Sequence, residues 1–110
     1  GDPVLAVGRQ LRHMAALSGS MLRNAVRAAD EMDPGLARNV LERDAELDAE
    51  FAAALRLVMS YVLQDHRFLR PTIDTIFALK GLERIGDHAT NIAEQVLYMM
   101  GQDRQQADAA

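Results

Sequence analysis

The sequence has 110 residues, of which 49% are hydrophobic and 25% are charged, a balance typical of one folded domain and not of a disordered chain. The absence of cysteine excludes disulfide bonds and thiolate metal sites, and the net charge of −4 with 5% aromatic residues argues against nucleic acid as a partner. No stretch approaches the roughly 20 apolar residues that cross a bilayer, so we expect no membrane insertion.

Helix boundaries are indicated by proline and its neighbours. Pro3, Pro34 and Pro71 are each expected in the first turn of a helix. Asp2 and Asp33 directly precede two of these prolines, and their carboxylates can accept hydrogen bonds from first-turn amides. The third proline has no such neighbour, so Asp65 or Thr72 is expected to mark that boundary. Gly101 supplies the final stop.

Apolar residues recur at spacings of three and four in all three segments, the period of an amphipathic helix. The first seam contains Val4, Val7, Leu11, Met14, Ser18, Met21, Ala25, Ala28 and Met32. The second contains Val40, Asp44, Leu47, Phe51, Leu55, Val58 and Val62. The third contains Ile73, Ile76, Phe77, Leu82, Ile85, Ala89, Ile92, Val96 and Met99. No segment alternates with the period of two that a half-buried strand requires.

The pattern predicts an all-α fold, an antiparallel up-down-up three-helix bundle with helices of about 30 residues. Residues 1–102 are expected to form the bundle and residues 103–110 a disordered tail. The six methionines are expected to fill the core. His13 and His66 are expected on the surface, with no acidic residue level with His13.

A carboxylate interrupts the second apolar seam. Asp44 occupies a seam position where an apolar side chain is expected, and a carboxylate there is costly unless it is paired. Asp48 lies one turn further on, so both side chains share a face and can hold one cation. The third helix repeats this spacing with Glu83 and Asp87. Asn91 and Glu94 continue that polar stripe.

The two acidic pairs are expected at similar heights in the bundle. If the turn between the second and third helices is centred near Phe68, Asp48 is level with His88 and Asp44 is level with Ile92. The first pair then stands at the height of Asp87 and Asn91. Such an oxygen-rich cluster suits Mg, Mn, Ca or Fe, and His88 would favour a transition metal.

Two other interpretations remain open from the residues alone. Acidic pairs at this spacing usually form a solvated helix face. A buried network with the first helix, which offers Ser20, Arg23, Asn24 and Arg27 at this height, is as well supported as a metal site.

An enzyme is not expected. The sequence has no glycine-rich phosphate loop and no Ser/His/Asp arrangement in a suitable context. A di-iron carboxylate bundle would require two Glu-x-x-His motifs, and the segments that begin at Glu83 and Glu94 both lack the histidine.

The stretch LERIGDHATNIAE at residues 82–94, followed by VLYMMGQD, closely resembles the signature helix of the PhoU family of phosphate-transport regulators. ERDAELDAEF, which contains Asp44 and Asp48, resembles the other acidic motif of that family. The resemblance runs from about Leu11 to Gln102 and corresponds to the C-terminal three-helix repeat. Asp65-His66 departs from the Asp-Pro of many members.

The resemblance implies metal motifs of Glu or Asp, three residues, then Asp, which map onto Asp44/Asp48 and Glu83/Asp87. Fe, Mn, Mg or Zn would be bound, with Asn91, Glu94 and His88 in the metal shell.

The implied function is a cytoplasmic adaptor, held at the inner face of the membrane through its partners, that restrains phosphate uptake and the phosphate-starvation response. It would contact a transporter ATPase subunit and a sensor histidine kinase, and could form a homodimer. The alternative is a metal-independent helical interaction domain.

Overall fold

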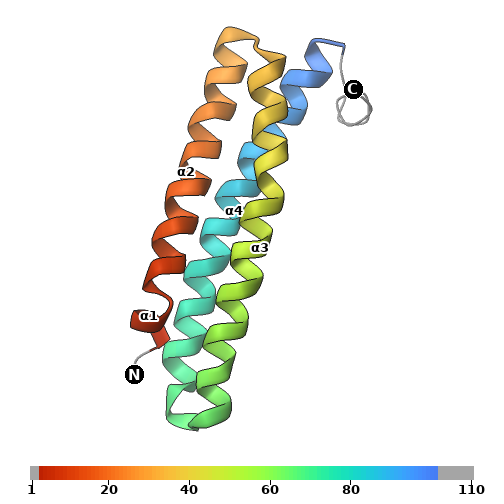
Figure 1. Cartoon of the computed structure of the whole chain (residues 1–110). Helices are drawn as coiled ribbons and strands as arrows, with labels where there is room; N and C mark the ends of the chain where they lie inside the picture. The colour runs from red at the N-terminus through yellow and green to blue at the C-terminus, as the bar shows by residue number, and fades with distance from the viewer. Residues whose placement is uncertain (1–2, 102–110) are drawn as a thin grey trace.

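The computed structural model describes residues 3–101, with side chains from Leu5 onward. The elements are α1 (Pro3–Ala6), α2 (Gly8–Glu31), α3 (Pro34–Gln64), the short 3-10 helix η1 (His66–Phe68) and α4 (Leu69–Met99). Figure 1 shows α2, α3 and α4 running up, down and up along a rod with extents of 53, 24 and 17 Å. The predicted all-α, up-down-up bundle is therefore confirmed.

The first predicted helix is interrupted near its start. Val7 has φ −97° and ψ 9°, and this turn separates the four-residue α1 from α2. The Val7 side chain is fully buried and its carbonyl accepts a hydrogen bond from the Leu11 amide at 2.8 Å. The first of the predicted helices is therefore divided at this point, although its seam residue Val7 stays in the core. Asp2, the predicted cap, lies outside the described residues.

The turn between α2 and α3 follows the predicted capping chemistry. Met32 adopts the left-handed conformation with φ 50°, which ends α2. Asp33 Oδ1 then accepts a hydrogen bond from the Leu36 amide at 3.1 Å, and Pro34 begins α3. This arrangement satisfies a first-turn amide that has no partner within the helix.

Asp65 marks the turn between α3 and α4, as predicted. Its carboxylate caps η1 by accepting from the Arg67 amide at 2.9 Å, and it also pairs with the Arg67 guanidinium at 2.7 Å. These hydrogen bonds hold the pKa of Asp65 below its usual value. Pro71 lies in the first turn of α4, and Gly101 follows the helix with φ 73°.

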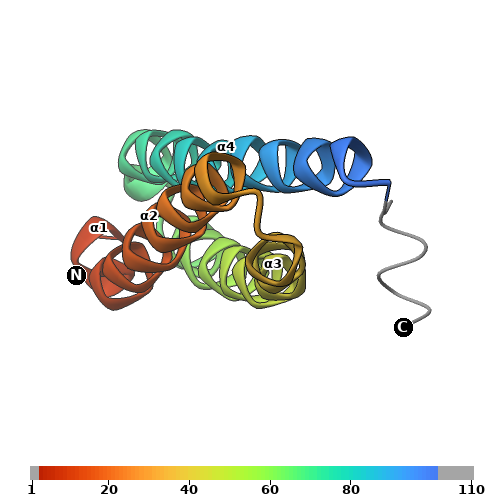
Figure 2. The same ribbon diagram turned by 90° about the horizontal axis from the view of Figure 1, so that it is seen from above.

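The core lies between the three long helices, which all pack against one another (Figure 2). Its fully buried large side chains include Met14, Met21, Val40, Leu47, Val58, Leu79, Val96 and Leu97. In α2 and α3, these large core side chains belong to the predicted apolar seams. Gaps are filled by alanines, which allow the helices to approach closely.

The seam predicted for the third helix was partly wrong, because α4 turns a different face inward. Ile73, Phe77 and Met99 are exposed, whereas Thr72, Thr75, Leu79 and Gly86 are buried. The buried stripe therefore includes positions with polar or absent side chains. Thr75 is tolerated there because its hydroxyl donates to the Pro71 carbonyl at 2.8 Å.

The expectation that the methionines fill the core was also only partly correct. Met14 and Met21 are fully buried, but Met32, Met59, Met99 and Met100 are all exposed. His66 is exposed in the turn, as predicted. No helix within residues 3–101 is long and apolar enough to cross a bilayer.

Candidate metal centre

The two helices that carry the acidic pairs meet closely at Gly86. A Cβ placed on this glycine would collide with Leu47 Cδ2 of α3 and would lie 4.0 Å from Asp44 Oδ1. Gly86 is buried within the LERIGD segment, between the two acids of α4. The missing side chain is therefore what permits this close approach of α3 and α4.

This contact corrects the predicted register. With Leu47 against Gly86, and the Lys80 ammonium 5.3 Å from the centroid of the Phe51 ring, α4 is displaced by about one turn from the expected alignment. Asp44 is therefore nearer to the height of Gly86 than to that of Ile92. The reason is that the turn is centred near Asp65 and His66, where α3 ends and η1 begins, and not at Phe68. The shift brings the Asp44/Asp48 pair level with the Glu83/Asp87 pair.

Their helix positions place the four carboxylates along the line where α3 and α4 meet, hereafter the carboxylate groove. Asp44 and Asp48 share a helix face, and the contact of Asp44 with Gly86 turns that face toward α4. Glu83 and Asp87 follow Lys80 at spacings of three and four, and the contact of Lys80 with Phe51 turns their stripe toward α3. Asp44 and Glu83 are partly buried, while Asp48 and Asp87 are exposed.

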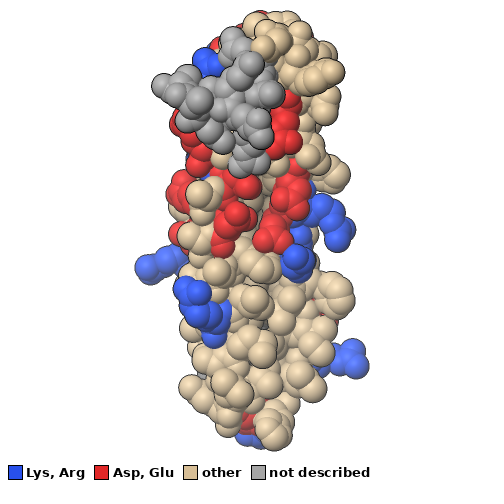
Figure 3. Space-filling model, turned by 90° about the vertical axis from the view of Figure 1, so that its right-hand side faces the viewer, with Lys and Arg blue, Asp and Glu red and all other residues tan. Residues whose placement is uncertain are grey.

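Figure 3 views the side of the rod on which α3 and α4 lie next to each other, away from α2. Acidic side chains gather on the upper half of this face, and the lower half is largely uncharged. The acids named above lie in the upper half because they are level with Gly86, beyond the middle of α4. One half of this face therefore has a concentrated negative charge.

The donor set fits a hard or borderline cation, since it consists of carboxylate oxygens presented by two helices held in register. Within residues 3–101, no three Asp, Glu or His side chains converge closely enough to hold one ion. A bound metal would therefore require carboxylates along the groove to rotate toward it, which the exposed Asp48 and Asp87 can do at low cost.

The remaining predicted shell residues occupy different positions. Asn91 and Glu94 continue the stripe of Asp87 at spacings of four and three, with Asn91 exposed and Glu94 partly buried. His88 is exposed and lies about 100° further around α4 than Asp87, on the side away from α3. Asn91 and Glu94 are thus better placed than His88 to reach a cation in the groove.

Two first-helix residues of the rival network, Arg27 and Ser20, bond to residues other than the four carboxylates. Arg27 Nε pairs with Glu31 Oε2 of its own helix at 2.9 Å, and Arg23 is exposed. Ser20 instead accepts a hydrogen bond from Arg43 of α3 at 2.9 Å. Because Asp48 and Asp87 are exposed, a buried network with the first helix is limited to the partly buried Asp44 and Glu83.

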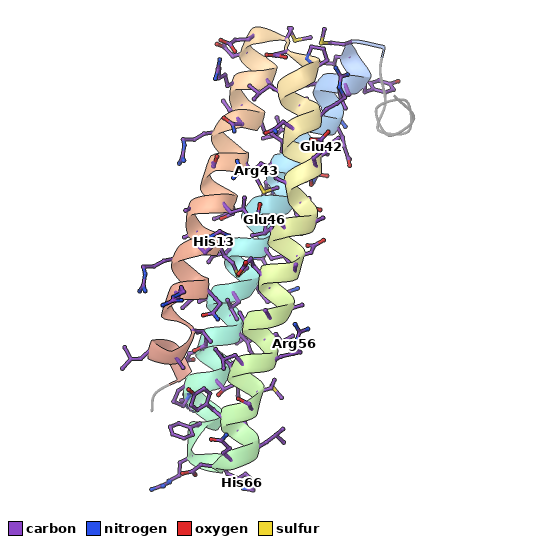
Figure 4. The ribbon with its side chains drawn as sticks, in the orientation of Figure 1. His13, Glu42, Arg43, Glu46, Arg56 and His66 are labelled. Carbon is purple, nitrogen blue, oxygen red and sulfur yellow. The ribbon has the colours of Figure 1, made fainter. Side chains whose placement is uncertain are left out.

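His13 has acidic neighbours that the sequence analysis did not find. Its Nε2 lies 3.3 Å from Glu46 Oε1 and 3.8 Å from Glu50 Oε1, in the groove between α2 and α3 (Figure 4). The expectation that nothing acidic is level with His13 was wrong, although its predicted surface position is confirmed. This contact joins α2 to the face of α3 opposite the carboxylate groove.

Lys80 was not recognised from the sequence as part of the site. Its Nζ pairs with Glu83 Oε1 at 2.7 Å. A protein ammonium group thus already provides positive charge to one of the four carboxylates. The signal was present in the sequence, because Lys80 and Glu83 are three residues apart on one helix.

Replacing Lys80 with methionine should strengthen metal binding by up to about fivefold, because the metal would no longer compete with an ammonium group worth about 1 kcal/mol or less at a partly exposed pair. Methionine retains an apolar stem against Phe51. Titration with Mn²⁺ under calorimetry measures the change. Arg84→Met, which removes an exposed cation one residue beyond Glu83, is the control and should alter the affinity less. Equal effects would show that Lys80 does not compete specifically for this site.

The fold is an antiparallel three-helix bundle, with two of the predicted acidic residues on α3 and two on α4. The PhoU domain model matches residues 11–96, and the chain belongs to the PhoU family. The predicted resemblance to this family is thereby confirmed.

Individual relatives agree with this assignment. The chain is 43% identical over 98 residues to the phosphate-specific transport system accessory protein PhoU homolog of Xylella fastidiosa strain Temecula1, covering 89% of this chain and 41% of the relative. It is 38% identical over 91 residues to the homolog of Pseudomonas aeruginosa, covering 83% and 38%.

A solved structure shows the same fold. The crystal structure of PhoU from Pseudomonas aeruginosa matches with a TM-score of 0.78 and 39% identity, over 82% of this chain and 43% of that chain. The present chain therefore spans about two fifths of the length of these relatives and corresponds to one domain-sized repeat.

Proposed function

We propose that this domain is a phosphate-signalling adaptor that acts through a metal-carboxylate cluster on α3 and α4. The observation that carries the proposal is the close approach of α3 and α4 at Gly86, beside Leu47 and Asp44. We infer that this approach lets Asp44, Asp48, Glu83 and Asp87 act together. The names of the relatives support an accessory role in phosphate-specific transport. The proposed role is regulatory and not catalytic.

The chemistry of the groove explains how one surface can respond to a metal and to phosphate. Without metal, four carboxylates repel an anion. A bound Mg²⁺, Mn²⁺, Zn²⁺ or iron ion reverses the local charge and, where it retains exchangeable ligands, can accept phosphate oxygens. Asn91 and Glu94 would extend the site along α4. Phosphate binding would therefore depend on metal loading.

The proposed biological consequence follows from this charge reversal. A surface that changes its charge with metal and phosphate can alter its fit to a partner. By analogy with the family, the partners would be a transporter ATPase subunit and a sensor histidine kinase, and the effect would be to restrain phosphate uptake and phosphate-starvation signalling. The adaptor would work in the cytoplasm, at the inner face of the membrane.

Elemental analysis after loading with iron, manganese, magnesium or zinc tests the metal site. We expect at least one ion per wild-type chain and loss of that ion in Asp44→Ala/Asp87→Ala. The matched control is Glu42→Ala/Asp74→Ala, which removes one acid from each helix outside the groove and should retain the metal. Equilibrium dialysis with labelled phosphate should then show retention by the metal-loaded wild type only.

A folded wild type that binds no metal would overturn the metal proposal and leave a metal-independent helical interaction domain. Metal bound equally by wild type and Asp44→Ala/Asp87→Ala would show that the site lies elsewhere. Metal binding without phosphate retention would preserve the cluster and remove its direct link to phosphate. Circular dichroism of each variant establishes that it is folded.

A further inference from the structure

The lower half of the α3/α4 face differs sharply from the acidic upper half. Its exposed apolar side chains are Met59 and Leu63 on α3 and Leu69, Ile73 and Phe77 on α4, hereafter the apolar end patch. Leu63 is 81% exposed and Phe77 is 73% exposed. Figure 3 shows that this half of the face is nearly free of acidic side chains. Exposed apolar patches of this kind mark contact surfaces.

Two helices contribute to this patch side by side. On α4, Leu69, Ile73 and Phe77 are four residues apart and form one stripe. On α3, Met59 and Leu63 form a second stripe at the same spacing, and both lie beside the turn that joins the helices. Because α3 ends at Gln64 and α4 begins at Leu69, both stripes lie at the same end of the rod.

A hollow of about 420 Å³ lies within the patch and is lined by Leu69, Arg70, Ile73, Asp74 and Phe77. It combines an apolar wall with one guanidinium and one carboxylate. Such a lining suits an amphipathic ligand that has an apolar part and an anionic group for Arg70.

Charged residues are also distributed unevenly between the two halves of the rod. The half of the rod that contains the patch, residues 3–12 and 52–81, has six basic residues and two acidic ones. The basic residues are Arg9, Arg12, Arg56, Arg67, Arg70 and Lys80, and the acidic ones are Asp65 and Asp74. The other half, residues 13–51 and 82–101, has five basic and eleven acidic residues. Apolar exposure and positive charge therefore coincide at one end.

This combination favours an anionic lipid surface over a second copy of the chain. Two apolar end patches brought together would also bring together two sets of Arg56, Arg70 and Lys80, and these like charges repel. An anionic bilayer attracts the same cations while its interface accepts leucine and phenylalanine side chains. It also repels the acidic half, which orients the rod.

We propose that the apolar end patch docks this domain on an anionic membrane surface, with the acidic half of the α3/α4 face held away from the lipid. Leu63 and Phe77 enter the interface, and Arg56 and Arg70 contact lipid phosphates. The carboxylate groove then stays open to solvent, where metal and partners can reach it. The docking itself does not depend on metal and stands apart from the proposed function.

Co-sedimentation with phospholipid vesicles tests this proposal. The full chain should bind vesicles of phosphatidylcholine mixed with phosphatidylglycerol, and bind pure phosphatidylcholine at least tenfold more weakly. Leu63→Ser/Phe77→Ser should weaken binding to the anionic vesicles by at least tenfold, because two inserted side chains are lost. Arg56→Glu/Arg70→Glu should weaken it by a similar factor and remove its sensitivity to salt.

Matched controls place the same changes in the acidic half. Val26→Ser/Tyr98→Ser removes two exposed apolar side chains there, and Arg23→Glu/Arg84→Glu reverses two exposed cations. Both controls should bind as the wild type does. All of the substituted side chains are exposed, and circular dichroism verifies the fold of each variant.

The proposal is overturned if the wild type does not bind anionic vesicles, or if the control pairs lose binding as strongly as the patch variants. Analytical ultracentrifugation tests whether a second copy of the chain occupies the apolar end patch instead. Self-association that is lost in Leu63→Ser/Phe77→Ser, without vesicle binding, would assign the patch to a second copy of the chain. Binding that persists in both patch variants would assign the lipid contact to another surface.

Discussion

Replacing Gly86 with valine should lower the free energy of unfolding by about 3 kcal/mol, near the upper end of the usual cost of overpacking a core. The added side chain would occupy space that holds Leu47 Cδ2 and lies beside Asp44. Leu47 is fully buried and has little room to move. Chemical denaturation of the variant and the wild type measures the effect.

Gly81→Val is the matched control on the same helix. A Cβ at Gly81 would have no neighbouring atom within 4 Å, and the residue is exposed. Valine there removes a glycine from a helix interior and should change stability by about 0.5 kcal/mol or less, in the stabilising direction. If the two valine variants are equally stable, the close approach of α3 and α4 at Gly86 is not required.

The Gly86 variant also separates packing from metal chemistry. All four carboxylates remain in Gly86→Val, but the two helices that carry them would be pushed apart. Metal affinity should therefore fall under conditions in which the variant is still folded. Leu47→Ala in the same chain should relieve part of the clash, giving a coupling energy of about 1–3 kcal/mol. Recovery of metal binding in the double variant would tie the register of the groove to its function.

The helices could be predicted from local chemistry, because each signal acts within one turn. Asp33 before Pro34 predicted the start of α3, and Gly101 predicted the end of α4. The break at Val7 was not predicted, although Gly8 directly follows it, because one glycine inside a helical pattern does not by itself require a break. Periodicity identifies a helix but does not show where it bends.

The candidate site was predicted in composition but not in alignment. Asp44 was predicted to be a site residue because it interrupts an apolar seam. The spacing of each acidic pair predicted that its two side chains share one helix face. The register depended on the position of the turn, which is centred near Asp65 and His66 and not on Phe68. The role of Gly86 was not predicted because the absence of a side chain has no apolar or charged signal. Only its contact with Leu47 reveals its importance.

The face of α4 that packs inward was the main error, and its cause is physical. This helix has two stripes that look buried in the sequence. Ile73 and Phe77 are large and apolar, yet they face outward, while Thr72 and Thr75 face inward. A threonine hydroxyl that bonds to a carbonyl of its own helix is compatible with a core. Hydrophobicity alone therefore could not decide between the two stripes.

Alanine substitution at neighbouring positions distinguishes these stripes directly. Leu79→Ala should lower the free energy of unfolding by about 3 kcal/mol, because it leaves a cavity around a fully buried side chain. Phe77→Ala removes a larger side chain, but one that is mostly exposed, and should change stability by about 0.5 kcal/mol. Urea denaturation of both variants provides the comparison.

The opposite ranking would mean that α4 is rotated and that Phe77 belongs to the core. That result would also remove the apolar end patch, because Phe77 is one of its two most exposed members. The expected ranking also bears on why α4 exposes an apolar stripe. A protein that keeps phenylalanine and isoleucine on the surface while burying threonine gains little stability from that surface, so the exposed stripe is better explained by contact with something outside the bundle.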